Sequence, residues 1–486
     1  MHEREKIERE DNSALRTPHS ALLRSAAWMA WSGAVSIANG VVVWMAYARW
    51  RETAELGKFT IVMGLYTIFV TVCTLGLGPY IASEVARRKE QNSGFTSEFI
   101  SSAAVFLSAW SLVSAAAMSL TGLLVSDSRE VRAAVAILSL AMLPTGLLGV
   151  AEPVCTALGR ARLIALATTV ENVLRTVVPL ALLYLDCNLS VICISFVGVR
   201  IVACLIYAGA ARRQLAGLVR ARGSLIRSIA ARAPAFAGIT VLASLHLQAA
   251  AVFIGRLGGE TDTAQFGAAS RLLIPVAVLM AGYVSVVQPA ASRLADVSLP
   301  GLGEFLSRSL RLVMALVLPC AVGMALLARD LLAVLFGGRL VAAAPALSLL
   351  ALSIVPFGAV MIVSRGLIAT GNQRIDLAGN AAAVAVNLGL NLLLIPRYGA
   401  TGAAGAQLVS MMTLLVIEAA YSARRLYRLE FGTAVIACAV PLGLMALVVW
   451  QARALGFWSA ATSGAVVYLG CAMLVRRDLR LAFSRQ

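Results

Sequence analysis

Apolar stretches of about 18 to 24 residues recur along the whole chain and are separated by short polar loops. A helix needs about 20 apolar residues to cross the roughly 30 Å hydrocarbon core of a bilayer. The stretches do not alternate apolar with polar residues, as the strands of a membrane barrel do. The pattern therefore predicts about fourteen transmembrane helices. They are expected at residues 27–47, 60–82, 98–119, 131–151, 163–185, 189–209, 236–256, 267–288, 310–328, 343–364, 376–396, 403–422, 433–450 and 456–475.

The composition agrees with an all-α polytopic membrane protein. Of the 486 residues, 60% are hydrophobic and only 13% are charged, whereas about one quarter of a typical soluble protein is charged. The formal net charge is +17. With the N-terminus placed in the cytoplasm, 27 of the 41 Lys and Arg residues fall in cytoplasmic segments and 10 in loops on the other side. This bias is the positive-inside rule, so the charge indicates topology and we expect no nucleic-acid partner.

The chain shows no pattern for a nucleotide motor, a metal site or a disulfide framework. The eight cysteines lie mostly within the predicted spans and form no Cys-x-x-Cys pair, which argues against disulfides and against a metal. No GxxxxGK[ST] phosphate-binding loop occurs. The polar segment from Met1 to Arg24 leads directly into the first span without a signal-peptide cleavage pattern. We therefore expect neither a metal nor a cofactor.

Two pairs of motifs recur six spans apart. Residues 156–164 resemble residues 368–376, each with a Gly-x-x-Arg turn before a span, and residues 79–83 resemble residues 289–292. A displacement by an even number of spans gives both copies the same orientation in the membrane. The repeat therefore predicts two parallel, pseudo-symmetric six-helix lobes related by an axis along the membrane normal, followed by two C-terminal helices.

The predicted organisation has six parts. They are a cytoplasmic N-tail (1–26), an N-lobe (27–209), a basic inter-lobe linker (210–235), a C-lobe (236–422), spans thirteen and fourteen (423–475) and a cytoplasmic C-tail (476–486). Arginines and apolar residues alternate along the linker. It can be an amphipathic helix on an anionic cytoplasmic leaflet, or a charged connection that only fixes the topology.

Several motifs in the chain resemble a known family. Gly371 begins a cytoplasmic turn, an asparagine-bearing helix follows, and the run Ile-Pro-Arg-Tyr-Gly that ends at Gly399 leads into Gly402-Ala-Ala. Leu75-Gly-Leu-Gly-Pro and Leu335-Phe-Gly-Gly are further motifs of the same kind. Their order and spacing are similar to the polysaccharide-transport branch, the Wzx-type flippases, of the multidrug/oligosaccharidyl-lipid/polysaccharide exporter superfamily. The resemblance covers nearly the whole chain.

The resemblance implies a flippase that moves a lipid-linked oligosaccharide, usually on undecaprenyl diphosphate, between the leaflets of the bacterial cytoplasmic membrane. Two lobes would enclose a central cavity that opens to either side in turn. Spans thirteen and fourteen would form a groove for the lipid tail, as in a related flippase of peptidoglycan precursor. The expected partners are the lipid-linked substrate, membrane lipids, and polysaccharide polymerase or assembly proteins.

Arginines within the spans are candidate ligands for a diphosphate, because a guanidinium binds two oxygens and stays charged. Charged groups in a span usually face a cavity or a partner. The candidate cavity cations are Arg175, Arg271 and Arg365. Each also has a structural interpretation, because Arg175 can pair with Glu171 one turn earlier, and the other two lie near span ends where they can extend to the interface.

Acidic and neutral polar residues within the spans supply the other candidates. The candidates for ion or proton coupling are Glu152, Glu171 and Glu418. The candidate polar contacts in the cavity are His246, Gln248, Asn387 and Asn391, with Asn380 on the same helix face as the last two. For all of them, hydrogen bonding to a neighbouring helix is the alternative interpretation.

Two other functions compete with the flippase. A cation-coupled multidrug exporter of the same superfamily would typically have twelve spans and an acidic cavity, whereas here the arginines in the spans equal or outnumber the carboxylates. A membrane-bound polysaccharide polymerase or ligase would need a long outer loop to hold an acceptor, and no predicted outer loop exceeds about a dozen residues. The sequence therefore favours a transporter and not an enzyme.

The predicted topology can be tested with a fused reporter. A reporter fused at Gly258 lies between spans seven and eight and should be active outside the cytoplasm. Activity only in the cytoplasm would contradict the assignment of every loop, because each span reverses the side of the next.

Overall fold

The computed structural model describes residues 39–89, 93–210 and 221–483, together with Val35. All regular elements in these residues are helices, and eleven of the described helices are long and apolar enough to cross a membrane. The predicted all-α polytopic fold is confirmed. The predicted N-tail, most of the first span, residues 211–220 of the predicted linker and the last three residues of the C-tail lie outside the described residues.

The N-terminal bundle carries predicted spans two to six. Its helices are α3 (Thr53–Thr74), α4 (Gly78–Lys89), α5 (Ser93–Val125), α6 (Arg129–Ser139), α7 (Met142–Ala157), α8 (Ala161–Tyr184) and α9 (Leu189–Ala210). Span two is divided between α3 and α4, because the backbone has positive φ at Leu75 and Gly76. Span four is divided between α6 and α7 at Leu140 and Ala141, where the backbone stays in the right-handed helical region.

The C-terminal part of the chain carries the remaining predicted spans. Its elements are α11 (Gly223–Leu257), α12 (Glu260–Arg271), α13 (Ile274–Val297), α14 (Leu299–Leu326), α15 (Ala328–Phe336), η1 (Gly338–Ala343), α16 (Ala344–Ala369), α17 (Gln373–Arg425), α18 (Phe431–Ala452), η2 (Arg453–Leu455) and α19 (Phe457–Phe483). The second half of the predicted linker is helical and continues without a break into span seven as α11.

Predicted spans eleven and twelve form the single element α17, which kinks at Gly399 (φ 53°, ψ −130°). A residue with a side chain would be strained in this backbone conformation. Space is also lacking, because an added Cβ would lie 2.5 Å from a carboxylate oxygen of Asp262 on α12. The kink therefore lets the two spans pack against each other and brings α12 against their connection.

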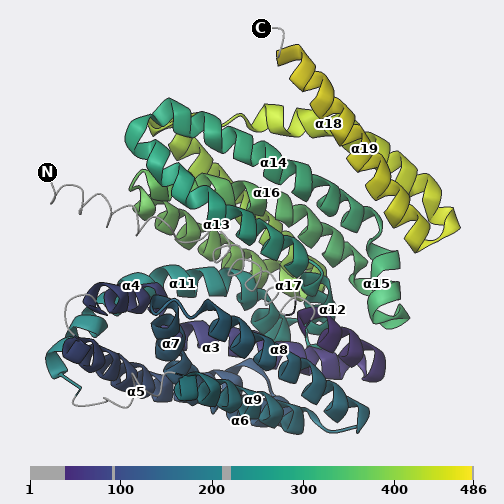
Figure 1. Ribbon diagram of the computed structural model, residues 1–486. Coiled ribbons are helices and arrows are strands. Elements are labelled where there is room, and N and C mark those ends of the chain that lie inside the picture. Colours follow the sequence, from purple (N-terminus) through teal and green to yellow (C-terminus); the bar gives the residue numbers. More distant parts are fainter. Residues whose placement is uncertain (1–34, 36–38, 90–92, 211–220, 484–486) are drawn as a thin grey trace, which may run out of the picture.

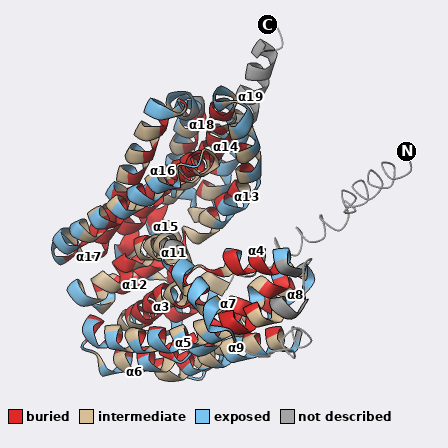
Figure 2. Cartoon of the chain, turned by 90° about the vertical axis from the view of Figure 1, so that its left-hand side faces the viewer, coloured by how far each residue is buried: buried red, intermediate tan, exposed pale blue. Residues whose placement is uncertain are grey.

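Large apolar side chains are exposed on the outward faces of the bundles. Examples are Leu124 (70% exposed), Ile436 (72%) and Val466 (69%). Figure 2 shows the exposed residues on the faces turned away from neighbouring helices. Exposure of such surface to water is unfavourable by about 25 cal/mol per Å², whereas lipid tails are as apolar as leucine. The exposed faces are therefore those expected of a multi-pass membrane protein.

Figure 1 shows two helical bundles side by side, with α18 and α19 at the far edge of the second. Helix α11 packs in both. Ile229 and Ala233 near its beginning lie in a core with residues of α4, α5 and α7, and the rest of α11 packs along α3 and α17. Among the described helices other than α11, the extended contact between the bundles is made by α3, which packs against α12. Helices α4, α5, α7, α8 and α9 make no extended contact with α13, α14, α16 or α17.

The bundles meet on the side of the molecule that carries the loops at Asp186, Gly259 and Gly399. We call it the outer side, after the topology that the Lys and Arg bias predicts, and the opposite side the inner side. Glycines let the helices approach closely there, as in other membrane bundles. An added Cβ at Gly57 of α3 would lie 1.9 Å from the carbonyl oxygen of Glu260 on α12, and one at Gly267 of α12 would lie 2.6 Å from Oγ1 of Thr60 on α3.

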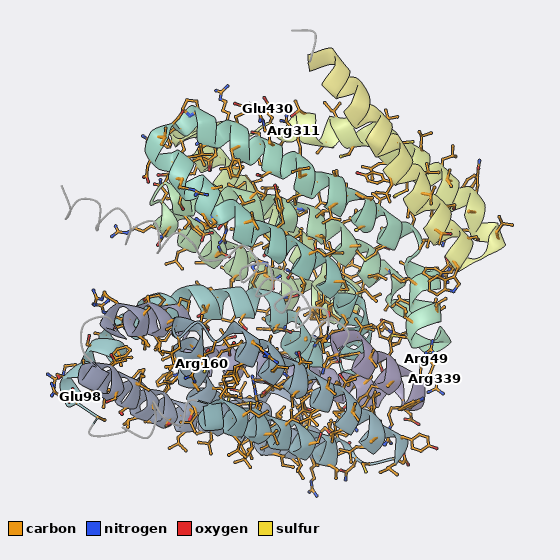
Figure 3. All side chains as sticks on the ribbon, viewed as in Figure 1. Arg49, Glu98, Arg160, Arg311, Arg339 and Glu430 are labelled. Carbon is orange, nitrogen blue, oxygen red and sulfur yellow. The ribbon has the colours of Figure 1, made fainter. Side chains whose placement is uncertain are left out.

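Arginines join the two bundles on the same side. Arg49 donates from Nη2 to the carbonyl oxygen of Val334 (2.5 Å) and from Nε to that of Leu335 (3.2 Å). These carbonyls end α15, where the helix dipole favours a cation. Arg339 in turn donates from Nη1 to the carbonyl oxygen of Arg51 (3.3 Å). Figure 3 shows Arg49 and Arg339 together at this end of the molecule. The outer side is thus closed by both packing and hydrogen bonds.

Gly57→Ala should separate the bundles on the outer side, because a methyl group cannot fit between α3 and Glu260. Spin labels at Tyr184 and Leu455, both exposed near outer loops, would report the separation by pulsed electron spin resonance in a background lacking the eight native cysteines. We expect a longer mean distance than in the parent protein.

Gly64→Ala on the same helix is the control. Its Cβ would lie 3.5 Å from Cβ of Ala251, an ordinary contact, so the distance distribution should not change. Identical distributions in Gly57→Ala and the parent protein would contradict the tight α3–α12 contact.

Candidate functional site

A cavity of about 210 Å³ lies among the helices of the second bundle, with walls from α11, α12, α13, α16 and α17. Its walls are mostly apolar. The polar side chains that line it are Gln248, Ser270, Arg271, Ser353 and Gln407. The cavity therefore combines a hydrophobic surface with one cation and a few hydrogen-bonding groups, which is the usual character of a ligand site.

Arg271 supplies the charge of this cavity. It ends α12, and its guanidinium carbon lies 4.3 Å from the ring centroid of Trp44, which comes from the predicted first span. The Nε atom of Arg271 is buried and donates no hydrogen bond. Within the described part of the chain the cation is therefore held over an aromatic face with no carboxylate paired to it, and its Nε–H is available to an anion.

A second polar cluster lies within the first bundle and centres on Glu171 of α8. Its Oε1 atom accepts a hydrogen bond from Nη1 of Arg200 on α9 (2.8 Å), and Nη1 of Arg175 lies 3.6 Å away. Arg200 also donates from Nε to the hydroxyl of Tyr66 on α3 (2.9 Å). The predicted Glu171–Arg175 pair is present, but Arg200 is the closer partner. One carboxylate thus serves two guanidiniums, and Arg175 is the less tightly held of the two.

A row of aromatic rings connects the two arginine sites. Arg175 lies 5.3 Å from the ring centroid of Phe196. The ring of Phe59 lies 6.3 Å from Phe196 and 5.1 Å from Trp44, and Trp44 carries Arg271. The charge of Arg175 also acts on the Arg271 guanidinium, and the two cations, from different bundles, lie at the two ends of this row of rings. Arg175 is not among the residues that line the cavity of Arg271.

The remaining predicted site residues fall in three other places. Glu152 is exposed and lines a separate inner-side cavity of about 490 Å³ with residues of α3, α4 and α11. Arg365 and Glu418 lie close together near the inner end of the second bundle. Asn387 and Asn391 are buried in a chain of hydrogen bonds, in which Asn391 donates to Asn387 (2.8 Å) and Asn387 donates to Gln407 (3.2 Å).

His246 joins α11 to α17 and does not line the cavity that Gln248 lines. Its Nε2 atom lies 3.3 Å from the hydroxyl of Ser410, whose single hydrogen is donated to the carbonyl oxygen of Ala383 (2.7 Å). Nε2 of His246 must therefore carry the proton and donate it to Ser410, which assigns the neutral ring from the hydrogen-bond network. Among the described residues, no group of three or more His, Cys, Asp or Glu side chains could hold a metal.

An apolar groove of about 420 Å³ separates the second bundle from the last two helices. Its walls come from α13, α14 and α15 on one side and from α18 and α19 on the other. Near one end, the Tyr468 hydroxyl of α19 donates to the carbonyl oxygen of Ala315 on α14 (2.7 Å). The groove is lined almost entirely by aliphatic and aromatic side chains and therefore suits a hydrocarbon chain.

A comparison with known families identifies the family of this chain. A family model described as "Polysaccharide biosynthesis protein" matches residues 47–345, more than half of the chain. The chain belongs to this family of polysaccharide biosynthesis proteins. No curated protein matches it. The family resemblance read from the sequence motifs is thereby confirmed.

Solved structures show the fold of this polysaccharide biosynthesis protein. A structure of the lipid II flippase MurJ in an inward closed conformation has a TM-score of 0.73 at 14% identity and covers 94% of this chain and 99% of its own. An inward-facing multidrug resistance MATE family transporter of the MOP superfamily gives 0.63 at 15% identity, with 80% and 94% covered. A MOP superfamily transporter from Pyrococcus furiosus gives 0.58 at 15% identity, with 83% and 95% covered. The fold is that of transporters and not of a membrane enzyme.

Several residues of the site were missed or undervalued at the level of sequence. Trp44 and Tyr66 look like ordinary apolar residues of a span, and only the structure shows them beside Arg271 and Arg200. Asp376 opens α17 and looks like a helix-start residue, yet it lies beside Glu418. The available signal for Asp376 was its place four residues before Asn380, whose amide donates to it (3.2 Å).

The two arginines around Glu171 should differ in their effect on stability. Arg200→Ala removes the 2.8 Å partner of Glu171 and the donor to Tyr66, so the free energy of unfolding should fall by roughly 1–3 kcal/mol. Arg175→Ala removes a 3.6 Å ion pair and the contact with the Phe196 ring and should lower it by about 1 kcal/mol or less. Thermal unfolding of both purified variants measures the difference. Equal losses would show that Glu171 holds both arginines to the same degree.

Proposed function

We propose that this polysaccharide biosynthesis protein translocates a lipid-linked oligosaccharide or polysaccharide precursor, carried on undecaprenyl diphosphate, across the bacterial cytoplasmic membrane. Movement occurs by alternating access of the two bundles. The single observation that carries the proposal is the pair Arg175 and Arg271, two cations from different bundles at the two ends of one row of aromatic rings. Family membership supports the polysaccharide context.

The chemistry of a diphosphate fits this pair of arginines. A diphosphate carries several negative charges and cannot enter hydrocarbon without cations. Arginine binds phosphate oxygens with two parallel N–H groups and stays charged at any working pH. The diphosphate would bind Arg175 and Arg271 together, and the sugars would reach the neutral donors and acceptors of the cavity, Gln248 and Gln407.

The lipid part of the substrate has a separate place to bind. The groove between α14 and the α18–α19 pair is open at its side and is lined by Leu316, Met324, Met445 and Leu469 among other apolar residues. A polyprenyl chain lying there would stay in the hydrocarbon phase while its head group enters the protein. This arrangement removes the need to carry the tail through a polar interior.

The observed packing corresponds to one end of a transport cycle. Helices α3 and α12 and residues Arg49 and Arg339 close the outer side. On the inner side, apart from α11, the described helices of the two bundles are not packed together. A substrate would thus enter from the inner side, which the positive-inside bias makes the cytoplasmic side with both termini. Polysaccharide polymerase or assembly proteins would receive the product on the outer side.

A cation-coupled multidrug exporter is the second candidate function. The observation in its favour is Glu418, a carboxylate fully buried in the second bundle, since buried acids suit the recognition of cations. The same carboxylate has Arg365 as a charged neighbour, and the cavity itself offers Arg271 in place of an acid. A cationic drug would therefore be repelled from the cavity, and we prefer the flippase.

The distribution of lipid-linked oligosaccharides between the two leaflets tests the proposal. Host cells depleted of the protein should accumulate an undecaprenyl-linked glycan on the cytoplasmic face, and mass spectrometry would identify its glycan. An unchanged distribution together with greater sensitivity to cationic drugs would favour the second candidate.

Single arginine variants connect this result to the site. Arg175→Ala and Arg271→Ala should each reduce flipping at least about tenfold, since a hydrogen bond to a charged group contributes about 1.5–3 kcal/mol, while insertion into the membrane stays normal. Arg329→Ala, an exposed position at the start of α15, is the control and should flip at the parent rate. Normal flipping by Arg175→Ala would remove Arg175 from the mechanism.

A further inference from the structure

Glu418 is buried without a hydrogen-bond donor near the inner end of α17. Its side chain is 0% exposed, and neither carboxylate oxygen accepts a hydrogen bond from any residue that the structure describes. Gly379 on the other arm of α17 makes room for it, with Cγ of Glu418 3.7 Å from the position of an added Cβ. An ionised carboxylate in this setting is strongly unfavourable, because it has lost water without gaining a donor.

The carboxyl group of Asp376, one turn before Gly379, lies within hydrogen-bonding reach of Glu418. Oδ1 of Asp376 already accepts from the Ser364 hydroxyl (3.1 Å) and from the Asn380 amide (3.2 Å). Those two donors stabilise a negative charge on Asp376. Two carboxylates can hydrogen-bond each other only when one carries a proton. The hydrogen bonds are therefore satisfied when Asp376 is ionised and when Glu418 is protonated and donates a hydrogen bond to Asp376.

The charges around the pair lead to the same state. The positive charge of Arg365 on α16 attracts the carboxyl group of Glu418. The aromatic Tyr427, just beyond α17, also faces Glu418, and on α11 the neutral His246 contacts Ser410, two turns before Glu418. One guanidinium balances one carboxylate, so a single bound proton makes the buried cluster neutral.

A proton fits this place better than a metal cation does. Sodium and larger cations are bound by about six oxygen atoms in typical sites, whereas Oδ1 of Asp376 is already occupied by two donors. The adjacent Arg365 guanidinium would also repel a metal ion. A proton needs only the two facing carboxyl oxygens.

Two further buried hydroxyls connect the pair with the inner surface. Ser422 lies one turn after Glu418 and is 1% exposed, and Tyr427 is 7% exposed. Their two hydroxyls lie near each other, and neither has a well-aligned hydrogen-bond partner among the described residues. The Tyr427 ring extends from Gly303 to Gly366, next to Arg365. Tyr427 also lines a polar cavity of about 590 Å³ together with Arg311 and Glu430. Figure 3 shows Arg311 and Glu430 next to each other at the edge of the second bundle.

We propose that Glu418 and Asp376 together bind one exchangeable proton, which reaches them from the inner side past Tyr427 and Ser422. The Oε–H bond of Glu418 forms as a proton leaves water in the 590 Å³ cavity, and it breaks when the proton returns. The use of this proton to drive transport rests on the proposed function. Binding of the proton does not.

Infrared spectroscopy tests the site in the purified full-length protein, in lipid nanodiscs and without substrate. A protonated carboxyl gives a C=O stretching band that an ionised one lacks. The band should persist at a pH where exposed carboxyls are ionised. It should disappear in Glu418→Gln and be lost or shifted in Asp376→Asn. Glu304→Gln removes an exposed carboxylate paired with Arg308 and should leave the band unchanged.

Three results would overturn the proposal. They are the absence of the band, a band that survives Glu418→Gln, and a band that disappears on addition of sodium chloride but not of choline chloride. Because no glycan is present, failure of the flippase assignment would leave the infrared result in place.

Transfer to heavy water tests the route. The band should shift several-fold more slowly in Tyr427→Phe than in the parent protein. Tyr421→Phe is the control, because its hydroxyl donates to Asn372 (2.9 Å) and should not affect the exchange. Equal rates in Tyr427→Phe and the parent protein would exclude the proposed path.

Discussion

The low dielectric of the bilayer is the constraint on which this structure depends. A charge that enters hydrocarbon needs a partner, and three arginines of the spans find partners of different kinds. Among the described residues, Arg200 has a carboxylate and a phenol, Arg175 a distant carboxylate and a ring, and Arg271 a ring. The less an arginine is satisfied by the protein, the more it can offer to an anion. The arginines are thus less well satisfied by the protein from the interior of the first bundle toward the space between the bundles.

The same constraint explains how the bundles associate. Lipid provides no hydrophobic force between helices, so contact must come from close packing and hydrogen bonds. Gly57 and Gly267 allow the close packing, and Arg49 donates hydrogen bonds at the carbonyl end of α15. These contacts lie on the outer side only. A closure built from a few small contacts can be released without disrupting either bundle, which is what alternating access requires.

The fold could be predicted from the sequence, because a bilayer imposes a length and polarity on each span that are visible without tertiary information. The six-span repeat indicated the two bundles for the same reason. The site was less accessible. Arg175, Arg271 and Glu418 were recognised as unusual charges, but their partners Trp44, Tyr66 and Asp376 come from distant spans. The division of span two could not be predicted either, since it depends on the positive φ angles of Leu75 and Gly76.

Helix α11 has a mechanical consequence for the whole molecule. Its beginning is fixed in the core of the first bundle by Ile229 and Ala233, and its end is packed on α17 of the second. Any rotation of one bundle against the other must therefore bend this helix. Pro234 lies inside this helix, within the part that packs on the first bundle, and lacks the N–H that would otherwise resist bending. The hinge of the whole molecule would thus be a segment of one helix that belongs to both bundles, and not a flexible loop between them.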